Sequence, residues 1–166
     1  MNQQAPLPEK SWVATAARYD VPIFTSSPGD SSIGMNVAAM KLRGGETTVD
    51  PDLDVLQSTA IVYDAKVNGV VILGGGSPKN FYLQTQPTLW QILDLNRGGH
   101  EYVLQISPDS PQWGGLSGAT PSGAISWGTV QANMMKNPVV VYSDPTTAAP
   151  VAVVASPMKE FRVSAR

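Results

Sequence analysis

The run VVILGGGSPKN, residues 70–80, decides the fold of this chain. Its first residues are apolar and mostly β-branched, which is typical of a strand covered on both faces. A buried strand that ends in three glycines and continues into a helix is how an α/β fold brings bare backbone close to a ligand. A second glycine-rich run, GGLSGATPSGAISWGT at residues 114–129, is its counterpart later in the chain.

Strand-like and helix-like segments alternate around this run. The strand-like ones are short, apolar and bounded by Pro or Gly, at residues 21–26, 69–74, 101–107 and 138–143. The helix-like ones lie before, between and after them, at residues 9–20, 32–42, 54–67, 80–93 and 146–158. We expect the helix at 80–93 to bend or restart near Pro87. This alternation predicts an α/β fold with a doubly wound, mostly parallel sheet.

Composition bounds the organisation of the chain. Its 166 residues predict one domain, 1–166, with flexible ends at 1–10 and 159–166. Only 14% of the residues are charged, against roughly 25% in soluble domains. This deficit favours an oligomer, in which part of the surface faces another subunit. A weakly charged monomer is the alternative.

Several classes of function are excluded by what the sequence lacks. A net charge of −2 gives no electrostatic case for nucleic acid or anionic membrane. There is no cysteine and one histidine, so a Cys- or His-rich metal site is not expected. No apolar run approaches the roughly 20 residues of a membrane helix. Since the N-terminal segment also lacks the regions of a signal peptide, we expect a cytoplasmic protein.

The loops that follow the four predicted strands form the candidate site, because the carboxyl ends of parallel strands share one edge. These loops are rich in small and hydroxyl residues, which suits a polar ligand held by backbone groups. Each feature also has a structural interpretation. The glycines are a tight turn, Asp30, Ser32 and Asp144 cap helices, Trp127 is core or interface, and His100 is structural. Lys79, near a helix start, has either a specific partner or an exposed ammonium.

Four ordered motifs carry a resemblance: PIFTSSPGDSSIG, VILGGGSPKNF, GGLSGATPSGAISWG and VVVYSD. Together they resemble the C-terminal half of the deoxyhypusine synthase family and its homospermidine-forming relatives, over about residues 11–155. The resemblance implies tetramers built from tight dimers, with NAD near the dimer interface. It also implies transfer of an aminobutyl group from a polyamine, through a lysine imine, to an acceptor amine.

The resemblance assigns roles to individual positions. The implied cofactor-binding residues are Asp30, Ser32, Gly74, Gly76 and Asp144. Those implied for the polyamine are Gly114, Ser117 and Trp127.

The departures from the family are concentrated in the chemistry. Thr129 stands where the family has its imine-forming lysine, and a hydroxyl forms no Schiff base, so no catalytic residue is assigned. Gly123 and Met35 replace acidic residues that face the cationic amine, and Asn80 replaces a histidine of the eukaryotic pattern. Lys79 is retained, but it is not the family's covalent lysine.

Three functions follow from this pattern. One is a catalytically impaired subunit that assembles with itself or with a full-length relative. Another is half of a split NAD-dependent aminobutyltransferase, completed by a separate N-terminal-half partner. The third is a structural or accessory component of a larger assembly, which has kept the fold of the family and lost its chemistry. Low charge favours close association in each case.

Overall fold

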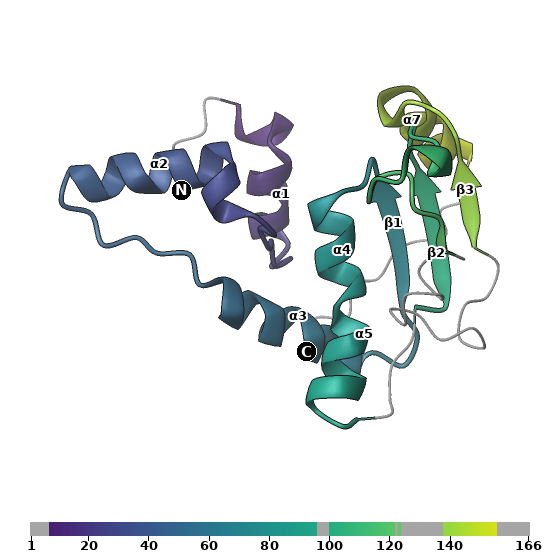
Figure 1. The fold of residues 1–166 in the computed structure, drawn as a ribbon. Helices are drawn as coiled ribbons and strands as arrows, with labels where there is room; N and C mark the ends of the chain where they lie inside the picture. Colours follow the sequence, from purple (N-terminus) through teal and green to yellow (C-terminus); the bar gives the residue numbers. More distant parts are fainter. Residues whose placement is uncertain (1–6, 96–99, 122, 124–137, 156–166) are drawn as a thin grey trace. The chain divides into compact units, whose positions relative to one another are not determined.

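The computed structural model describes residues 7–95, 100–121, 123 and 138–155 (Figure 1). The chain divides into two compact units, Met1–Ser58 and Thr59–Arg166. The single domain expected over 1–166 stays a prediction. Within the expected flexible N-terminus, Pro8–Lys10 form a 3-10 turn, η2.

The N-terminal unit is helical. Its elements are α1 (Trp12–Arg18), the 3-10 turn η3 (Pro28–Asp30), α2 (Ser32–Leu42) and the first part of α3 (Pro51–Asp64). Two serine hydroxyls cap the helices: Ser11 Oγ accepts from Ala14 N at 3.2 Å, and Ser31 Oγ accepts from Gly34 N at 3.4 Å. None of residues 7–57 is buried, so this unit has no core of its own.

The strand predicted at residues 21–26 is not present. The segment forms no strand in the part of the chain that the structure describes, and Val21 and Ile23 are exposed. A β-branched pattern gives a segment only a local preference, whereas a strand also needs a neighbour to pair with. Pro22 weakens pairing further, because it has no N–H to donate.

The C-terminal unit is built on a parallel sheet, which confirms the predicted fold class. Its strands are β1 (Gly69–Leu73), β2 (Tyr102–Ile106) and β3 (Val139–Val141), in the order β1-β2-β3. Both pairings are parallel, with Val71 opposite Leu104 and Leu104 opposite Val139. Three of the four predicted strands are therefore correct within one or two residues.

The helices of this unit also follow the sequence pattern. The segment predicted as one helix over 80–93 begins earlier, as α4 (Ser77–Leu83), and continues as α5 (Thr85–Pro87) and the π-helical turn η4 (Thr88–Ile92). The restart expected near Pro87 is thus observed. The last helix, α7 (Pro145–Ala155), contains Pro150. No helix of the described residues is long and apolar enough to span a bilayer.

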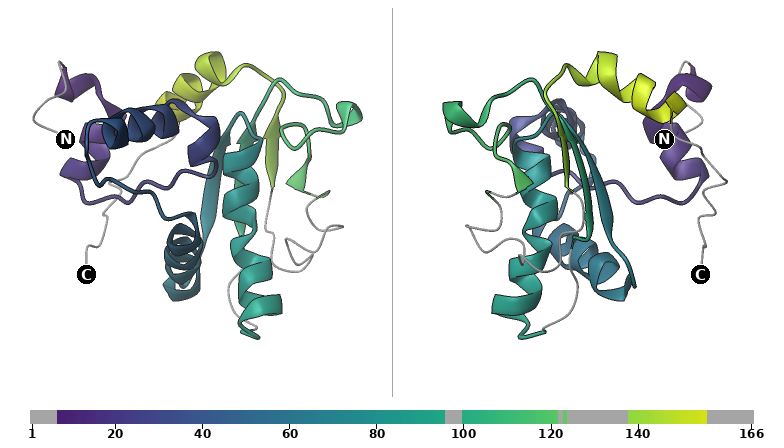
Figure 2. Two further views of the ribbon diagram at one scale, coloured as in Figure 1. Left: turned by 60° about the vertical axis from the view of Figure 1, so that its left-hand side comes forward. Right: turned by 90° about the vertical axis from the view of Figure 1, so that its right-hand side faces the viewer.

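The two faces of the sheet differ in burial. Figure 2 shows α4 running along one face of the sheet. The strand register puts Ile72, Val103 and Gln105 on one side, and all three are less than 9% exposed. The opposite face carries large apolar side chains in an apolar-lined groove of about 590 Å³ over β1, β2 and β3. We call this the open face, and it is defined by Val71 (64% exposed), Leu73 (57%), Tyr102 (49%) and Val139 (50%).

Candidate functional site at the carboxyl edge of the sheet

The glycine turn after β1 has a backbone that only glycine adopts easily. Gly74 has φ +86° and donates its N–H to the carbonyl of Ile106 on β2 at 2.8 Å. A Cβ built on Gly74 would meet no atom of the described residues within 4 Å apart from its chain neighbours, so the described backbone is open to a ligand here. A Cβ on Gly75 would lie 2.6 Å from Ser117 Cα, so this position tolerates no side chain.

The second glycine-rich run lies against the first. After β2 the chain makes the 3-10 turn η5 (Pro111–Trp113), which Gly114 ends in the left-handed conformation at φ +74°. Ser117 then packs on the glycine turn, with its Oγ 3.6 Å from the Cβ position of Gly76. The structure therefore joins, in one place, three of the residues that the resemblance assigned to ligands: Gly74, Gly76 and Ser117.

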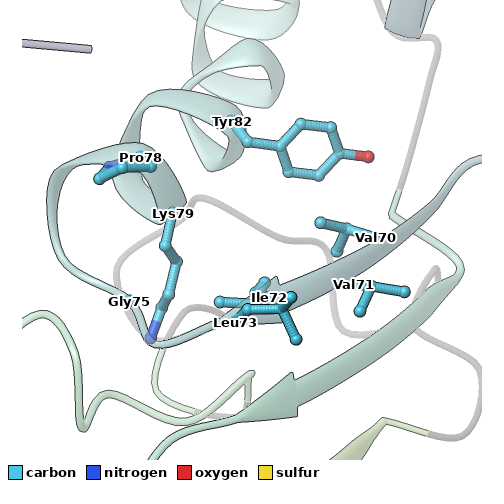
Figure 3. A pocket seen from close by; sticks show the side chains of 8 residues that line it. All are labelled: Val70, Val71, Ile72, Leu73, Gly75, Pro78, Lys79 and Tyr82. Carbon is cyan, nitrogen blue, oxygen red and sulfur yellow. The ribbon is translucent and has the colours of Figure 1, made fainter. Parts of the chain in front are cut away.

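Lys79, on α4, binds the loop that carries Ser117. Its side chain is 7% exposed and runs from α4 toward the glycine turn (Figure 3). Its Nζ donates to Gln105 Oε1 at 3.2 Å, to the carbonyl of Leu116 at 2.8 Å and to the carbonyl of Ala119. Of the two sequence interpretations of Lys79, the specific partner is correct and the exposed ammonium is wrong.

A groove of about 270 Å³ lies between α4 and β1 (Figure 3). Burial lowers the pKa of Lys79 and raises that of Tyr82 to about 12, so the phenol of Tyr82 is protonated near neutral pH. Most of the wall of this groove is apolar. The residues that line it are Val70, Val71, Ile72, Leu73, Gly75, Pro78, Lys79 and Tyr82.

His100 has the structural character that the sequence suggested. It is fully buried, and its ring lies 4.4 Å from that of Tyr82, between centroids, at an angle of 30°. Neither ring nitrogen has a hydrogen-bond partner among the described residues. Burial lowers the pKa of His100 from 6.5 to about 4, so the imidazole is neutral at pH 7. No pattern in the sequence indicated this depth of burial.

The carboxylate of Asp144 caps α7. Its Oδ1 accepts from Thr146 N at 2.7 Å and from Thr146 Oγ1 at 2.6 Å, and these bonds lower its pKa. The capping interpretation of Asp144 is therefore correct. In the N-terminal unit, however, the cap of α2 is Ser31, and neither Asp30 nor Ser32. The cofactor roles of all three residues stay predictions.

The remaining polyamine position and the positions of chemical departure are only partly described. Trp127 and Thr129 lie outside the described residues. Gly123 donates its N–H to Thr120 Oγ1 at 3.2 Å, and Met35 is exposed on α2. Among the described residues, no group of three His, Cys, Asp or Glu side chains could hold a metal ion.

The glycine turn leaves room for a ligand at the end of β1. Because the space above Gly74 is open in the described chain, a ligand can approach the bare backbone at the end of β1, as dinucleotide sites require. Gly76, at φ +72°, likewise has no side chain that could cover the backbone of the turn. On this observation the turn would hold the cofactor that the resemblance implies.

A parallel sheet with a glycine turn at its carboxyl edge defines a Rossmann-like α/β protein. Within this class, the family model for deoxyhypusine synthase matches residues 2–156. The "Deoxyhypusine synthase-like protein" of Nostoc punctiforme is 54% identical over 143 residues, which are 84% of this chain and 37% of that protein. "Probable deoxyhypusine synthase 2" of Methanosarcina acetivorans is 43% identical over 143 residues, 86% of this chain and 41% of that protein. In Archaeoglobus fulgidus the protein of the same name is 41% identical over 141 residues, 85% of this chain and 45% of that protein.

The chain therefore belongs to the deoxyhypusine synthase family. It spans about two fifths of the length of the curated relatives that it matches.

Proposed function

We propose that this chain is a deoxyhypusine-synthase-like subunit that has lost covalent amine transfer and acts by assembling with another polypeptide. The open face of the sheet is the observation that carries the proposal. All-parallel sheets are found almost only with both faces covered, yet here Val71, Leu73 and Val139 are each at least half exposed. An apolar face of this kind marks a surface of association.

The occupant that we propose for the open face is a polypeptide carrying the part of the family domain beyond the matched region. The curated relatives hold more than half of their length outside the matched residues. Such a partner would meet a groove lined by Gly69, Val70, Val71, Tyr102, Val103, Leu104 and Val139, with no charged side chain among them. The absence of any buried residue in 7–57 is a second reason to expect packing against a partner.

The loss of transfer rests on the sequence at the position of the family's covalent lysine. Thr129 offers a hydroxyl, and a hydroxyl forms no imine with a polyamine-derived carbonyl equivalent. Gly123 and Met35 supply no carboxylate to a cationic amine. NAD binding at the glycine turn remains part of the proposal, since the backbone at Gly74 is open. The expected compartment is the cytoplasm.

Co-expression tests the assembly. The tagged chain is produced with the part of the Nostoc punctiforme relative outside the matched residues, and the product is measured by light scattering after gel filtration. We expect a complex of one chain of each kind. Val71→Asp, on the open face, should abolish it, because a buried unpaired carboxylate is costly. Thr147→Asp, at an exposed position on α7, is the matched control and should leave it intact.

Two results would overturn this choice of partner. One is a stable complex of the chain with itself that Val71→Asp dissociates, which would make a second copy the occupant. The other is a complex with the relative's remainder that Val71→Asp leaves unchanged.

Incubation with a polyamine and NAD tests the lost chemistry. We expect no aminobutyl transfer from the chain or from its complex, and no covalent intermediate trapped by borohydride. Robust transfer by the unmodified protein would refute the proposal.

The open glycine turn favours a second candidate, a split enzyme half that still dehydrogenates a polyamine. It requires NAD reduction by the complex alone, without any adduct on this chain.

A further inference from the structure

One lysine of the described chain is buried, and it lies in the candidate site. Lys10, Lys41 and Lys66 are exposed, whereas Lys79 is 7% exposed beneath the loop that carries Ser117. A buried lysine can serve in two ways. As a nucleophile it needs a free, deprotonated amine within reach of a carbonyl. As a fixed cation it needs acceptors for its three N–H groups.

The geometry around Nζ is that of a fixed cation. An ammonium has three N–H donors, and Lys79 has three acceptors: Gln105 Oε1, the carbonyl of Leu116 and the carbonyl of Ala119. All three acceptors are neutral oxygens, and two of them are backbone atoms of the same loop. Burial lowers the pKa of the amine, but the acceptors occupy the directions from which a carbonyl carbon would have to approach.

Gln105 supplies the second connection to this loop. It lies on β2 and is 2% exposed, and its Nε2 donates to the carbonyl of Ser117 at 3.2 Å. Its Oε1 accepts from Lys79, so the two side chains also orient each other. We call the pair Lys79 and Gln105 the clasp. Through it, the carbonyls of Leu116, Ser117 and Ala119 are tied to α4 and β2.

The clasp holds the loop where it contacts the glycine turn. Ser117 Cα lies so close to Gly75 that a Cβ on that glycine would be 2.6 Å away. A loop without anchors would not keep this spacing, because its own backbone contributes only the bond from Ala119 N to Leu116 O, at 3.3 Å, within residues 116–119. The loop and the turn together present Gly74, Gly76 and Ser117 at the edge of the sheet.

We infer that Lys79 is a positioning residue, which with Gln105 sets the backbone of residues 116–119 against the glycine turn, and that it does not replace the amine missing at position 129. The inference concerns the isolated chain and is independent of the proposed assembly. It gives the buried ammonium a role in which no bond to a ligand is made or broken.

Competitive labelling of the unmodified chain tests the amine. Formaldehyde and cyanoborohydride convert each accessible lysine amine to its methylated form through an imine, and mass spectrometry reports the rate at each site. We expect Lys79 to react about tenfold more slowly than Lys10, Lys41 and Lys66, at every pH from 7 to 9. A Lys79 that reacts as fast as these three, or fastest at pH 7, would overturn the inference.

Hydrogen exchange of the full chain tests the positioning. In Lys79→Met, the amide of Ala119, which donates to the carbonyl of Leu116, should exchange about tenfold faster, while the amides of β1 keep their protection. Gln105→Met should release the same loop less, because it leaves the two bonds from Lys79 to the backbone. Lys66→Met is the matched control at an exposed lysine and should change neither region.

The pattern of exchange separates positioning from general stability. If Lys79→Met loosens β1 and the loop equally, the lysine supports the whole unit and the inference fails. If the loop keeps its protection in Lys79→Met, the clasp does not set its position. The labelling experiment needs no variant, so it decides the nucleophile question even if Lys79→Met does not fold.

Discussion

His100 makes the stability of this chain depend on pH in a way that one substitution removes. The imidazole is fully buried, and its pKa is about 4 in the folded chain against 6.5 when it is solvated. As the pH falls, the unfolded chain therefore binds the proton first. The stability that depends on a neutral His100 is present above about pH 6.5 and is lost as the pH falls toward 4.

The size of the effect follows from the two pKa values. Each unit of difference corresponds to about 1.4 kcal/mol, and the full difference is reached only below the folded pKa. Between pH 7.5 and pH 4.5 the loss from this one group is about 2.5 kcal/mol. His100→Phe keeps a ring against Tyr82, 4.4 Å away in the native pair, and has no group that titrates.

Urea unfolding at the two pH values measures this difference. We expect the free energy of unfolding of His100→Phe to fall about 2.5 kcal/mol less than that of the unmodified chain. Carboxylates contribute equally to both proteins, so the comparison isolates the imidazole. Gln86→Met is the matched control: Gln86 is as deeply buried and its amide also has no partner in the described part of the chain, but it does not titrate. An equal loss in His100→Phe and in the unmodified chain would refute the reasoning.

Three further predictions concern packing and capping. Gly75→Ala should displace the loop at Ser117 and raise the hydrogen exchange of that loop. Gly74→Ala, which meets open space at φ +86°, should cost only about 1 kcal/mol of unfolding free energy in urea. Equal effects of the two substitutions would contradict the close approach of Gly75 to Ser117. Asp144→Ala should speed hydrogen exchange in the first turn of α7. In the unmodified chain the same turn should loosen as the pH falls through the lowered pKa of the Asp144 carboxyl. An unchanged turn in Asp144→Ala would rule out the cap. Leu89→Ala, at a site 1% exposed, should cost about 3 kcal/mol in urea unfolding, and a cost under about 1 kcal/mol would mean that the core is not packed there.

The parts of the fold that sequence reasoning predicted are those that depend on local pattern. The apolar run at β1 and the glycines after it need no knowledge of distant residues, and both lie where the pattern predicts them. The strand expected at residues 21–26 depends on a pairing partner, which a pattern of side chains does not specify. The contact between Gly75 and Ser117 is also non-local, but the shared edge of a parallel sheet predicted that the two runs would meet.

The burial of Lys79 and His100 could not be predicted from the sequence, for a different reason. A charged or polar residue is buried only where the fold supplies acceptors or tolerates their absence, and that depends on backbone atoms far along the chain. The acceptors of Lys79 lie 26 to 40 residues away, at Gln105, Leu116 and Ala119. A lysine beside a glycine turn gave only the hint of a specific partner.

The clasp has a consequence for how this edge of the sheet changes in evolution. Lys79 and Gln105 hold the loop through carbonyl oxygens, which every amino acid possesses, and not through the side chains of Leu116, Ser117 or Ala119. Mutations at Leu116 and Ala119 can therefore alter what the loop presents while its course stays fixed. These two residues are thus a support on which a new surface can be selected one side chain at a time.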